Sequence, residues 1–253
     1  MSEFDPLLRE LDRWGEAGRS ATWWWRDDDA AQPSLALDQL LHLSDAPLAL
    51  AVVPAATDEA LAARLAPIPQ VAVLQHGYAH QNHAGTKEKK IELGPQRPAQ
   101  IVIGELATGK LRLEQLFSAK ALPVLVPPWN RIAPALVPVL PELGYRGLSQ
   151  FAPRARAKPV RGLVQSNCHL DLIDWQSRRF IGAEAAISAL VKHLALRYAG
   201  AASQPDVAGE PSGVMSHHAV HHKEAWAFLE RLLAVLTAHQ AAPALSAVEV
   251  FAL

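Results

Sequence analysis

Three acidic residues stand in a row near the start of the chain. Asp27, Asp28 and Asp29 follow a run of three tryptophans that ends at Trp25, with Arg26 between them. Adjacent carboxylates repel one another, so a strand end that keeps them together usually balances them with a cation or a metal ion. The alternative is a solvated acidic loop that contains a helix cap.

A histidine pair follows a later apolar run. His76 and His80 are four residues apart, a spacing that would place both imidazoles on one face if the segment were helical. Two imidazoles and a carboxylate from another strand form a three-ligand site with open positions, as in catalytic metal centres. Such a pair can also be incidental. His83 is expected beside the ligands, on the substrate side, or as a capping group.

Histidine is also concentrated near the C-terminal end of the sequence, with four of the 11 histidines between positions 217 and 222. Imidazole titrates near neutral pH and therefore suits a general acid or base. His217 is expected to have that role, and His218 to contact substrate. His221 and His222 are expected on the surface at the start of a helix.

An acidic pair precedes a tryptophan in the segment Asp171-Leu-Ile-Asp174-Trp175. A carboxylate hydrogen-bonded to a catalytic histidine orients the ring and favours its charged form. Asp171 and Asp174 are both candidates for this role. The alternative is a surface turn with Trp175 in the core.

A proline-rich segment contains a second candidate tryptophan. Pro127 and Pro128 stiffen the chain before Trp129 and Arg131. An aromatic face at this position suits a sugar ring, so Trp129, Arg131 and Trp175 are predicted to bind substrate. The alternative is an ordinary loop that connects a strand to a helix.

These groups follow short apolar runs that alternate with helix-like segments, a rhythm typical of βα units around a parallel sheet. The carboxyl ends of such strands converge on one mouth, where active sites form. Helices are predicted at Thr57–Leu65 with Thr57 as N-cap, Ala183–Tyr198 and Glu224–His239, and loops at Gly85–Pro98 and Gly200–Gly213. Strands are predicted at Ala21–Arg26, Leu48–Val53, Val71–Gln75, Pro123–Val126, Tyr145–Ser149, Gly162–Gln165 and Gly213–Ser216.

Composition excludes several classes of protein. Half of the 253 residues are hydrophobic, 19% are charged and the net charge is −1, which is unlike a disordered chain. We expect no nucleic-acid partner, because no basic excess is present. The single Cys168 cannot form an internal disulfide. No secretion signal or membrane span is apparent, so a cytoplasmic protein without a membrane partner is expected.

The motifs in this order resemble those of the polysaccharide deacetylase family, the NodB-homology carbohydrate esterases. An Asp-Asp strand end, a His-x-x-x-His pair, a Pro-rich aromatic loop, Asp-x-x-Asp-Trp and a hydrophobic-x-His run from Trp25 to His217. The resemblance implies an α/β fold in which residues 1–253 form one distorted (β/α)7 barrel. It also implies metal-dependent removal of N- or O-acetyl groups from an acetylated sugar, oligosaccharide or polysaccharide-related substrate.

The resemblance also implies roles for individual residues. Asp28 would be the general base and His217 the general acid, with Asp171 or Asp174 tuning that histidine. The register Asp27–Asp28 competes with Asp28–Asp29, because three aspartates are adjacent. Zinc is the first choice of metal, and Fe, Co, Ni or Mn also suit one carboxylate with two imidazoles; the implied ligands are Asp29, His76 and His80.

Three positions depart from the family pattern. Ala30 and Gly77 replace a usual Gly and a usual Ser or Thr, and Arg131 follows the prolines instead of preceding them. The cation beside Asp28 is therefore open among Arg26, Arg97 and Arg131. The departures favour a divergent, intracellular branch of the family, whose substrate need not be a polymer. The alternatives are a non-catalytic carbohydrate-binding protein on the same barrel and another metal-dependent hydrolase, of an amide or a phosphoester.

Overall fold

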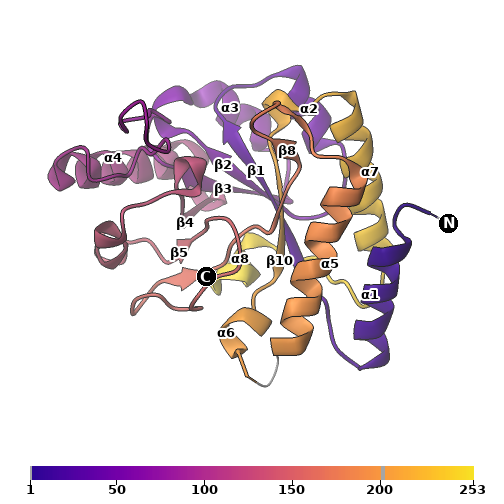
Figure 1. Ribbon diagram of the computed structural model, residues 1–253. Coiled ribbons are helices and arrows are strands. Elements are labelled where there is room, and N and C mark those ends of the chain that lie inside the picture. Colours follow the sequence, from indigo (N-terminus) through magenta and orange to yellow (C-terminus); the bar gives the residue numbers. More distant parts are fainter. Residues whose placement is uncertain (1, 201–202) are drawn as a thin grey trace.

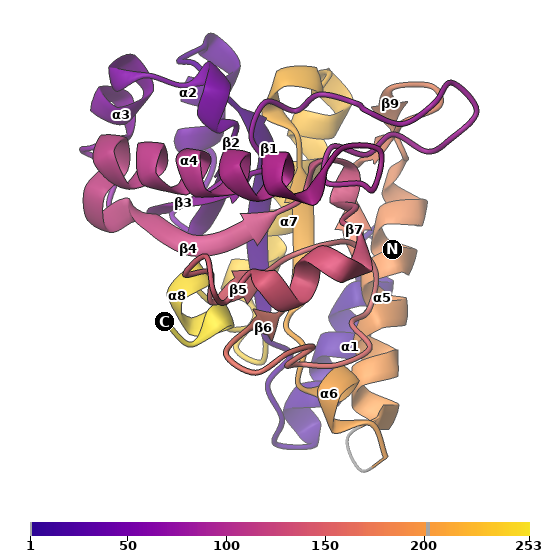
Figure 2. The same cartoon turned by 90° about the vertical axis from the view of Figure 1, so that its left-hand side faces the viewer.

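A parallel sheet of eight strands forms the centre of the computed structural model, which describes residues 2–200 and 203–253. Helices cover the outside of this curled sheet (Figures 1 and 2). The strand order is β6-β5-β4-β3-β2-β1-β10-β7. The bounds are β1 Trp23–Ala30, β2 Leu48–Val52, β3 Val71–His76, β4 Ala121–Val126, β5 Gly147–Leu148, β6 Val164–Gln165, β7 Leu170–Asp171 and β10 Ser212–Ser216.

The two edge strands, β6 and β7, belong to one continuous stretch, residues 164–171. On one side of this stretch, the Cys168 N–H donates to the carbonyl of Gln150 (3.0 Å). On the other side, the His169 N–H donates to the carbonyl of Gly213 (2.7 Å). The stretch therefore acts as one irregular strand against which the sheet curls back. This architecture confirms the predicted distorted (β/α)7 barrel.

Strand β1 is buried on both faces, as its unbroken apolar start indicates. Trp23 and Trp25 pack in the core beneath the outer helices, whereas Trp24 packs in the core inside the barrel. Side chains alternate along a strand, so Arg26 and Asp28 share the inward direction of Trp24. This alternation places a cation and a carboxylate inside the barrel.

The strand is irregular at its carboxyl end. Its pairing with β2 shifts register between Asp27 and Ala30, and Asp29 has a φ of 71°. A bulge of this kind re-aims a side chain. Asp28 and Asp29 therefore both face the same mouth, although strict alternation would separate them.

Helices α5 and α7 confirm two predicted segments, with their bounds shifted by one or two residues. A short antiparallel pair, β8 (Ile173–Asp174) and β9 (Arg179–Phe180), projects beside the main sheet. No helix among the described residues is long and apolar enough to cross a bilayer. The helices are α1 Asp5–Glu16, α2 Leu35–Leu41, α3 Glu59–Leu65, α4 Ala99–Phe117, α5 Ala183–Gly200, α6 Pro205–Ala208, α7 Lys223–Ala238 and α8 Ala247–Phe251.

Several local predictions need correction. Strand β1 continues to Ala30 instead of ending at Arg26, so the aspartates belong to the strand. The N-cap of α3 is Asp58, not Thr57, because the Asp58 side chain accepts from the N–H of Ala60 (2.9 Å). The predicted loop 200–213 contains α6, and its residues 201–202 lie outside the described part. Segment 85–98 lacks helix and strand, as predicted.

Candidate active site

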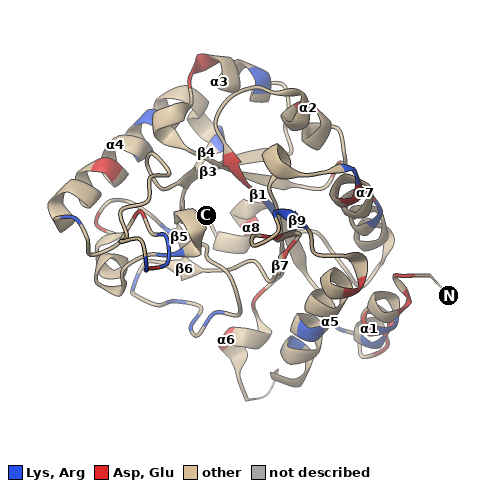
Figure 3. Cartoon of the chain, turned by 45° about the horizontal axis from the view of Figure 1, so that its top comes forward, with Lys and Arg blue, Asp and Glu red and all other residues tan. Residues whose placement is uncertain are grey.

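A cavity of about 1080 Å³ opens where the strands of the barrel end. Side chains from β1, β3 and β7, from the loop that follows β4 and from the residue after β10 line it. In the view of Figure 3, the acidic end of β1 lies inside the surrounding ring of helices and loops. The cavity therefore collects side chains that are far apart in the sequence.

Asp29, His76 and His80 meet on one side of this cavity. Asp29 Oδ1 lies 3.0 Å from His76 Nε2 and 3.1 Å from His80 Nε2. The two imidazoles do not share a helical face, because His76 ends β3 and His80 lies in the following loop with a φ of 55°. A strand end and a loop bring the two rings within 5.1 Å instead.

The hydrogen bonding of His76 shows that this cluster needs a cation. Its Nδ1 lies 3.0 Å from the carbonyl of Val126, so Nδ1 carries a proton and donates it. The Nε2 lone pair then faces the Asp29 carboxylate, an arrangement that only a proton or a metal ion stabilises. One carboxylate and two imidazoles beside an open cavity fit a catalytic divalent metal ion.

The same attraction appears in the titration of these groups. Burial opposes charge on Asp29, but its hydrogen bonds with His76 and His80 outweigh that effect and lower its pKa. Burial likewise disfavours the charged form of His76, yet the neighbouring Asp29 and Asp28 raise its pKa. The site therefore favours a positive charge between its carboxylate and its imidazoles.

Asp28 is paired with a fully buried arginine. Arg26 Nε lies 2.8 Å from Asp28 Oδ1, and Arg26 Nη2 lies 2.9 Å from Oδ2. Of the three candidate cations, Arg26 is therefore the one beside Asp28. Arg97 pairs with Glu105, and Arg131 donates to a backbone carbonyl. Arg26 also donates to the side-chain oxygens of Ser149 and Asn130.

His217 lies between two carboxylates. Its Nε2 is 4.0 Å from Asp28 Oδ2, and its Nδ1 is 3.6 Å from Asp171 Oδ1. Trp175 stands edge-on to the His217 ring and donates from Nε1 to Asp171 (2.7 Å). Burial raises the pKa of Asp171, although the nearby imidazole opposes the shift. His217 is therefore placed for proton transfer into the cavity.

Asp174 lines the cavity, but its carboxylate bonds to the turn that follows it and not to His217. Its carboxylate accepts from the N–H of Gln176 (3.1 Å) and from the Ser177 hydroxyl (2.6 Å). It therefore stabilises the turn between β8 and β9. Of the two acids that were candidates for orienting His217, the structure brings Asp171 to it.

The structure corrects the placement of His218. Its imidazole hydrogen-bonds to Asp27, which also accepts from the Ser216 hydroxyl (2.6 Å). Asp27 and His218 are both buried and lie outside the set of cavity-lining residues. The competing register with Asp27 at the site is therefore wrong, since Asp27 faces away from the cavity. The substrate contact predicted for His218 is wrong for the same reason.

The other histidines of interest lie away from the cavity lining. His83 is half-buried, and its N–H donates to the carbonyl of Ile91 (3.0 Å). His221 packs against Trp226 and accepts from the N–H of His217 (3.2 Å). His221 is thus half-buried, not a surface residue, whereas His222 is exposed.

Aromatic and cationic side chains surround the mouth of the cavity. Trp129 lies 4.4 Å from the His80 ring and has a φ of 54°. Trp175 is 48% exposed, which excludes the alternative that it belongs to the core. Phe151, which sequence reasoning missed, is also exposed and lines the same cavity. The basic side chains of the lining are Lys90, Arg131 and Arg178.

A second group of potential ligands, His169, His193 and Glu210, is fully buried. The two rings are stacked with centroids 3.3 Å apart, so their in-plane lone pairs do not converge on one point. The N–H of Gly213 donates to His169 Nδ1 (3.0 Å), which leaves the ring proton on Nε2, 3.2 Å from Glu210. The Nδ1 atom of each ring is hydrogen-bonded, in His193 to the Ser212 hydroxyl (2.9 Å), and the stacked geometry fits a buried core cluster, not a metal centre.

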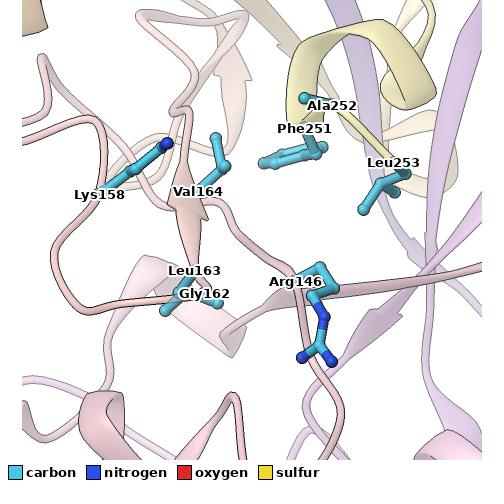
Figure 4. A pocket seen from close by; sticks show the side chains of 8 residues that line it. All are labelled: Arg146, Lys158, Gly162, Leu163, Val164, Phe251, Ala252 and Leu253. Atoms are coloured by element: carbon cyan, nitrogen blue, oxygen red, sulfur yellow. The ribbon is translucent and has the colours of Figure 1, made fainter.

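Another cavity, of about 470 Å³, lies beside β6 and α8 (Figure 4). Its lining combines apolar side chains such as Phe251 and Leu163 with Arg146 and Lys158, and includes no carboxylate side chain or imidazole. This smaller cavity therefore offers no carboxylate or imidazole side chain for acid–base chemistry.

Known proteins resemble this chain in structure but not detectably in sequence. No family sequence model and no curated protein sequence matches the chain. Solved structures do match it. A protein assigned as a polysaccharide deacetylase from Mycobacterium smegmatis is 15% identical, with a TM-score of 0.61 over 92% of this chain and 90% of the other. The chain has the polysaccharide deacetylase fold.

Two further structures share this deacetylase fold. A family 4 carbohydrate esterase from Streptomyces lividans, in complex with acetate, is 13% identical, with a TM-score of 0.53 over 89% of this chain and 91% of the other. A family 4 acetyl xylan esterase from Clostridium thermocellum, in complex with a cobalt ion, is 14% identical, with a TM-score of 0.52 over 91% and 90%. The low identities agree with a divergent sequence on this fold.

Proposed function

We propose that this protein is a metal-dependent deacetylase that hydrolyses an N-acetyl or O-acetyl group of a sugar or a sugar-like molecule. The observation that carries the proposal is one shared cavity floor. The Asp29–His76–His80 cluster, Asp28 and His217 all line one cavity, and His217 Nε2 lies 4.0 Å from Asp28 Oδ2. Deacetylation needs a polarised carbonyl, a base and an acid, and these groups can provide all three.

Asp29, His76 and His80 would hold the metal ion, for which zinc is our first choice. When bound, such an ion lowers the pKa of water and polarises an acyl oxygen. Asp28 then accepts a proton from the attacking water. Its ion pair with Arg26 holds the carboxylate in a fixed orientation, because both oxygens contact the guanidinium.

His217 supplies the second proton transfer. An amine leaves an acetamide poorly as an anion, so it needs a proton as the carbon–nitrogen bond breaks. His217 Nε2 lies 4.0 Å from Asp28 Oδ2, and Asp171 Oδ1 lies 3.6 Å from its other ring nitrogen. Asp171 stabilises the charged imidazole that donates this proton.

The mouth of the cavity is suited to a carbohydrate. The exposed ring of Trp175 and the half-buried ring of Trp129 line the cavity and offer flat apolar surfaces on which a sugar ring can stack. Arg131 lines the same mouth and can donate to sugar or acyl oxygens. Solved structures of this fold that are described as a carbohydrate esterase with acetate and as an acetyl xylan esterase support the acyl-transfer chemistry.

The test combines metal content with turnover. Wild type should bind about one equivalent of a transition metal by elemental analysis, and His76→Ala should lose it. His217→Ala should keep the metal but lose about 10²-fold or more in the rate on acetylated sugars. His83→Ala, outside the cavity lining, is the matched control. Turnover by His217→Ala at the wild-type rate would refute the assigned acid.

A metal-free wild type, even after reconstitution with Zn, Co, Ni or Fe, would contradict the proposed activity. Binding of acetylated sugars without turnover would then identify a non-catalytic carbohydrate-binding protein on this barrel. Hydrolysis of simple amides but not of acetylated sugars would support the proposed metal-dependent hydrolysis and contradict the proposed sugar substrate.

A further inference from the structure

Glu92 is a buried acid in the long loop between β3 and α4. Its side chain is only 1% exposed, although the sequence around it reads as a charged surface loop. Its carboxylate accepts three backbone hydrogen bonds, from the N–H groups of Tyr78 (3.0 Å), Ala79 (2.8 Å) and Gln81 (3.3 Å). These amides flank His80 in the chain, so one carboxylate holds the whole loop that carries this imidazole.

The two histidines of the cavity are supported in different ways. His76 ends a regular strand, and its Nδ1 is bonded to the carbonyl of Val126. His80 lies outside regular structure and has a left-handed backbone conformation, which costs about 1–2 kcal/mol for a residue with a side chain. The position of His80 therefore depends on the interactions that hold its loop in place.

The glycine after His76 makes room for this carboxylate. Gly77 has a φ of 58°, and a Cβ at this position would lie 1.9 Å from Glu92 Oε2 and 2.6 Å from Pro128. Any side chain at position 77 would therefore displace Glu92 or Pro128. Gly77 and Glu92 form a matched pair, in which the missing side chain of one admits the carboxylate of the other.

The backbone around Glu92 is itself anchored to the barrel. Arg97 donates to the carbonyl of Glu92 (3.3 Å) and forms an ion pair with Glu105 of α4 (2.7 Å). The carbonyl of Leu93 accepts from the N–H of Ala133 (2.8 Å) in the loop after β4. The carboxylate is thus connected to two elements of the scaffold, which makes it a fixed support and not a mobile surface group.

We propose that Glu92 is a positioning residue for the metal centre. It holds the loop that carries His80, so that the imidazole stays close to Asp29 and His76. The inference rests on the proposed function, because it assumes that these three residues hold a metal ion. Groups that orient metal ligands typically change metal affinity by about 10- to 100-fold when they are removed. Glu92 acts through backbone amides, in place of the usual direct bond to the imidazole.

The test measures metal affinity in the folded protein. Zn²⁺ and Co²⁺ affinities are obtained by competition with a chelator, at a temperature well below the melting point of each variant. Glu92→Ala should weaken binding about tenfold or more and change the Co²⁺ absorption spectrum. Glu92→Gln should be intermediate, because its oxygen can still accept from Ala79 and Gln81. Glu88→Ala is the control, since that exposed acid lies in the same loop.

A double-mutant cycle separates positioning from general stability. If Glu92 acts through His80, the Glu92→Ala change should have little further effect on affinity once His80 is replaced by Ala. An equal loss of affinity in the wild-type and His80→Ala backgrounds would overturn the proposal. Unchanged affinity and an unchanged Co²⁺ spectrum in folded Glu92→Ala would overturn it as well.

The outcomes also distinguish this inference from the proposed function. A wild-type protein that binds metal but hydrolyses no acetylated sugar would remove the deacetylase proposal and leave the role of Glu92 measurable through affinity. A wild-type protein that binds no metal would overturn both.

Discussion

The stacked pair His169 and His193 makes an acid-sensitive contribution to the stability of the fold. Glu210 beside it contributes in the opposite direction, because burial raises the pKa of that carboxyl to about 7. Both histidine side chains are buried, and burial, together with nearby Arg197 and Arg154, lowers the pKa of His169 to about 3. Burial, with His169 and the same two arginines, lowers the pKa of His193 to about 2. Both rings therefore stay neutral in the folded protein at pH 5, whereas they become charged in the unfolded chain below about pH 6.5.

The sign and size of the effect follow from proton linkage. A histidine whose pKa is lowered by folding stabilises the fold above its unfolded pKa, and that stabilisation is lost as the pH falls. Between pH 7.5 and pH 5 the unfolded chain gains nearly one proton at each ring. The corresponding loss in the free energy of unfolding is about 2 kcal/mol for each histidine, or about 4 kcal/mol for the pair.

The assay is urea unfolding between pH 7.5 and pH 5, with a chelator present so that metal release adds no pH dependence. His193→Phe removes one titrating ring and keeps a flat group over His169. Its loss of stability over this range should be smaller than that of wild type by about 2 kcal/mol. His42→Phe, at an exposed position, is the control. An unchanged pH dependence in His193→Phe would refute the reasoning.

Three further predictions concern buried groups of the barrel. Arg26→Met leaves a buried carboxylate unpaired and should cost about 3–5 kcal/mol in urea unfolding, whereas exposed Arg9→Met should change stability by less than about 0.5 kcal/mol; equal effects would contradict the ion pair. Gly213→Ala places a Cβ 2.5 Å from a backbone carbonyl oxygen and should lower the melting temperature, whereas Gly104→Ala, with open space around it, should not. Cys168 is buried, and burial raises its pKa to about 12. Iodoacetamide should therefore modify this thiol only at the rate of unfolding. Fast labelling of the native protein would contradict a closed barrel.

The elements that could be predicted from the sequence are those with a distinct hydrophobic pattern within their own residues. The central strands were found because both of their faces are buried and their residues are continuously apolar. Helix α4 was missed although Val102, Leu106, Leu113 and Phe117 repeat at helical spacing on its buried side. The signal is weakened by the charged segment that precedes the helix, residues 85–98.

The functional residues were predicted less evenly, for physical reasons. The two histidines were anticipated from their residue type and Asp29 from the family resemblance, but the geometry of the cluster depends on a bulge in β1 that no local pattern shows. His218 could not be separated from His217 by spacing, because strand pairing decides which of them faces the cavity. Glu92 gave no signal, since an acid in a charged loop is normally solvated.

The barrel is joined along residues 164–171 by very few strand pairs, two to β5 and two to β10. Amide hydrogen exchange should therefore be fastest, among the barrel strands, along this junction. Asp171 ends the same stretch and faces His217. Local opening there would separate the proton donor from its carboxylate while β1 and β3 kept Asp29 and His76 in place. The pairing of His217 with Asp171 would thus be lost before the arrangement of Asp29 and His76.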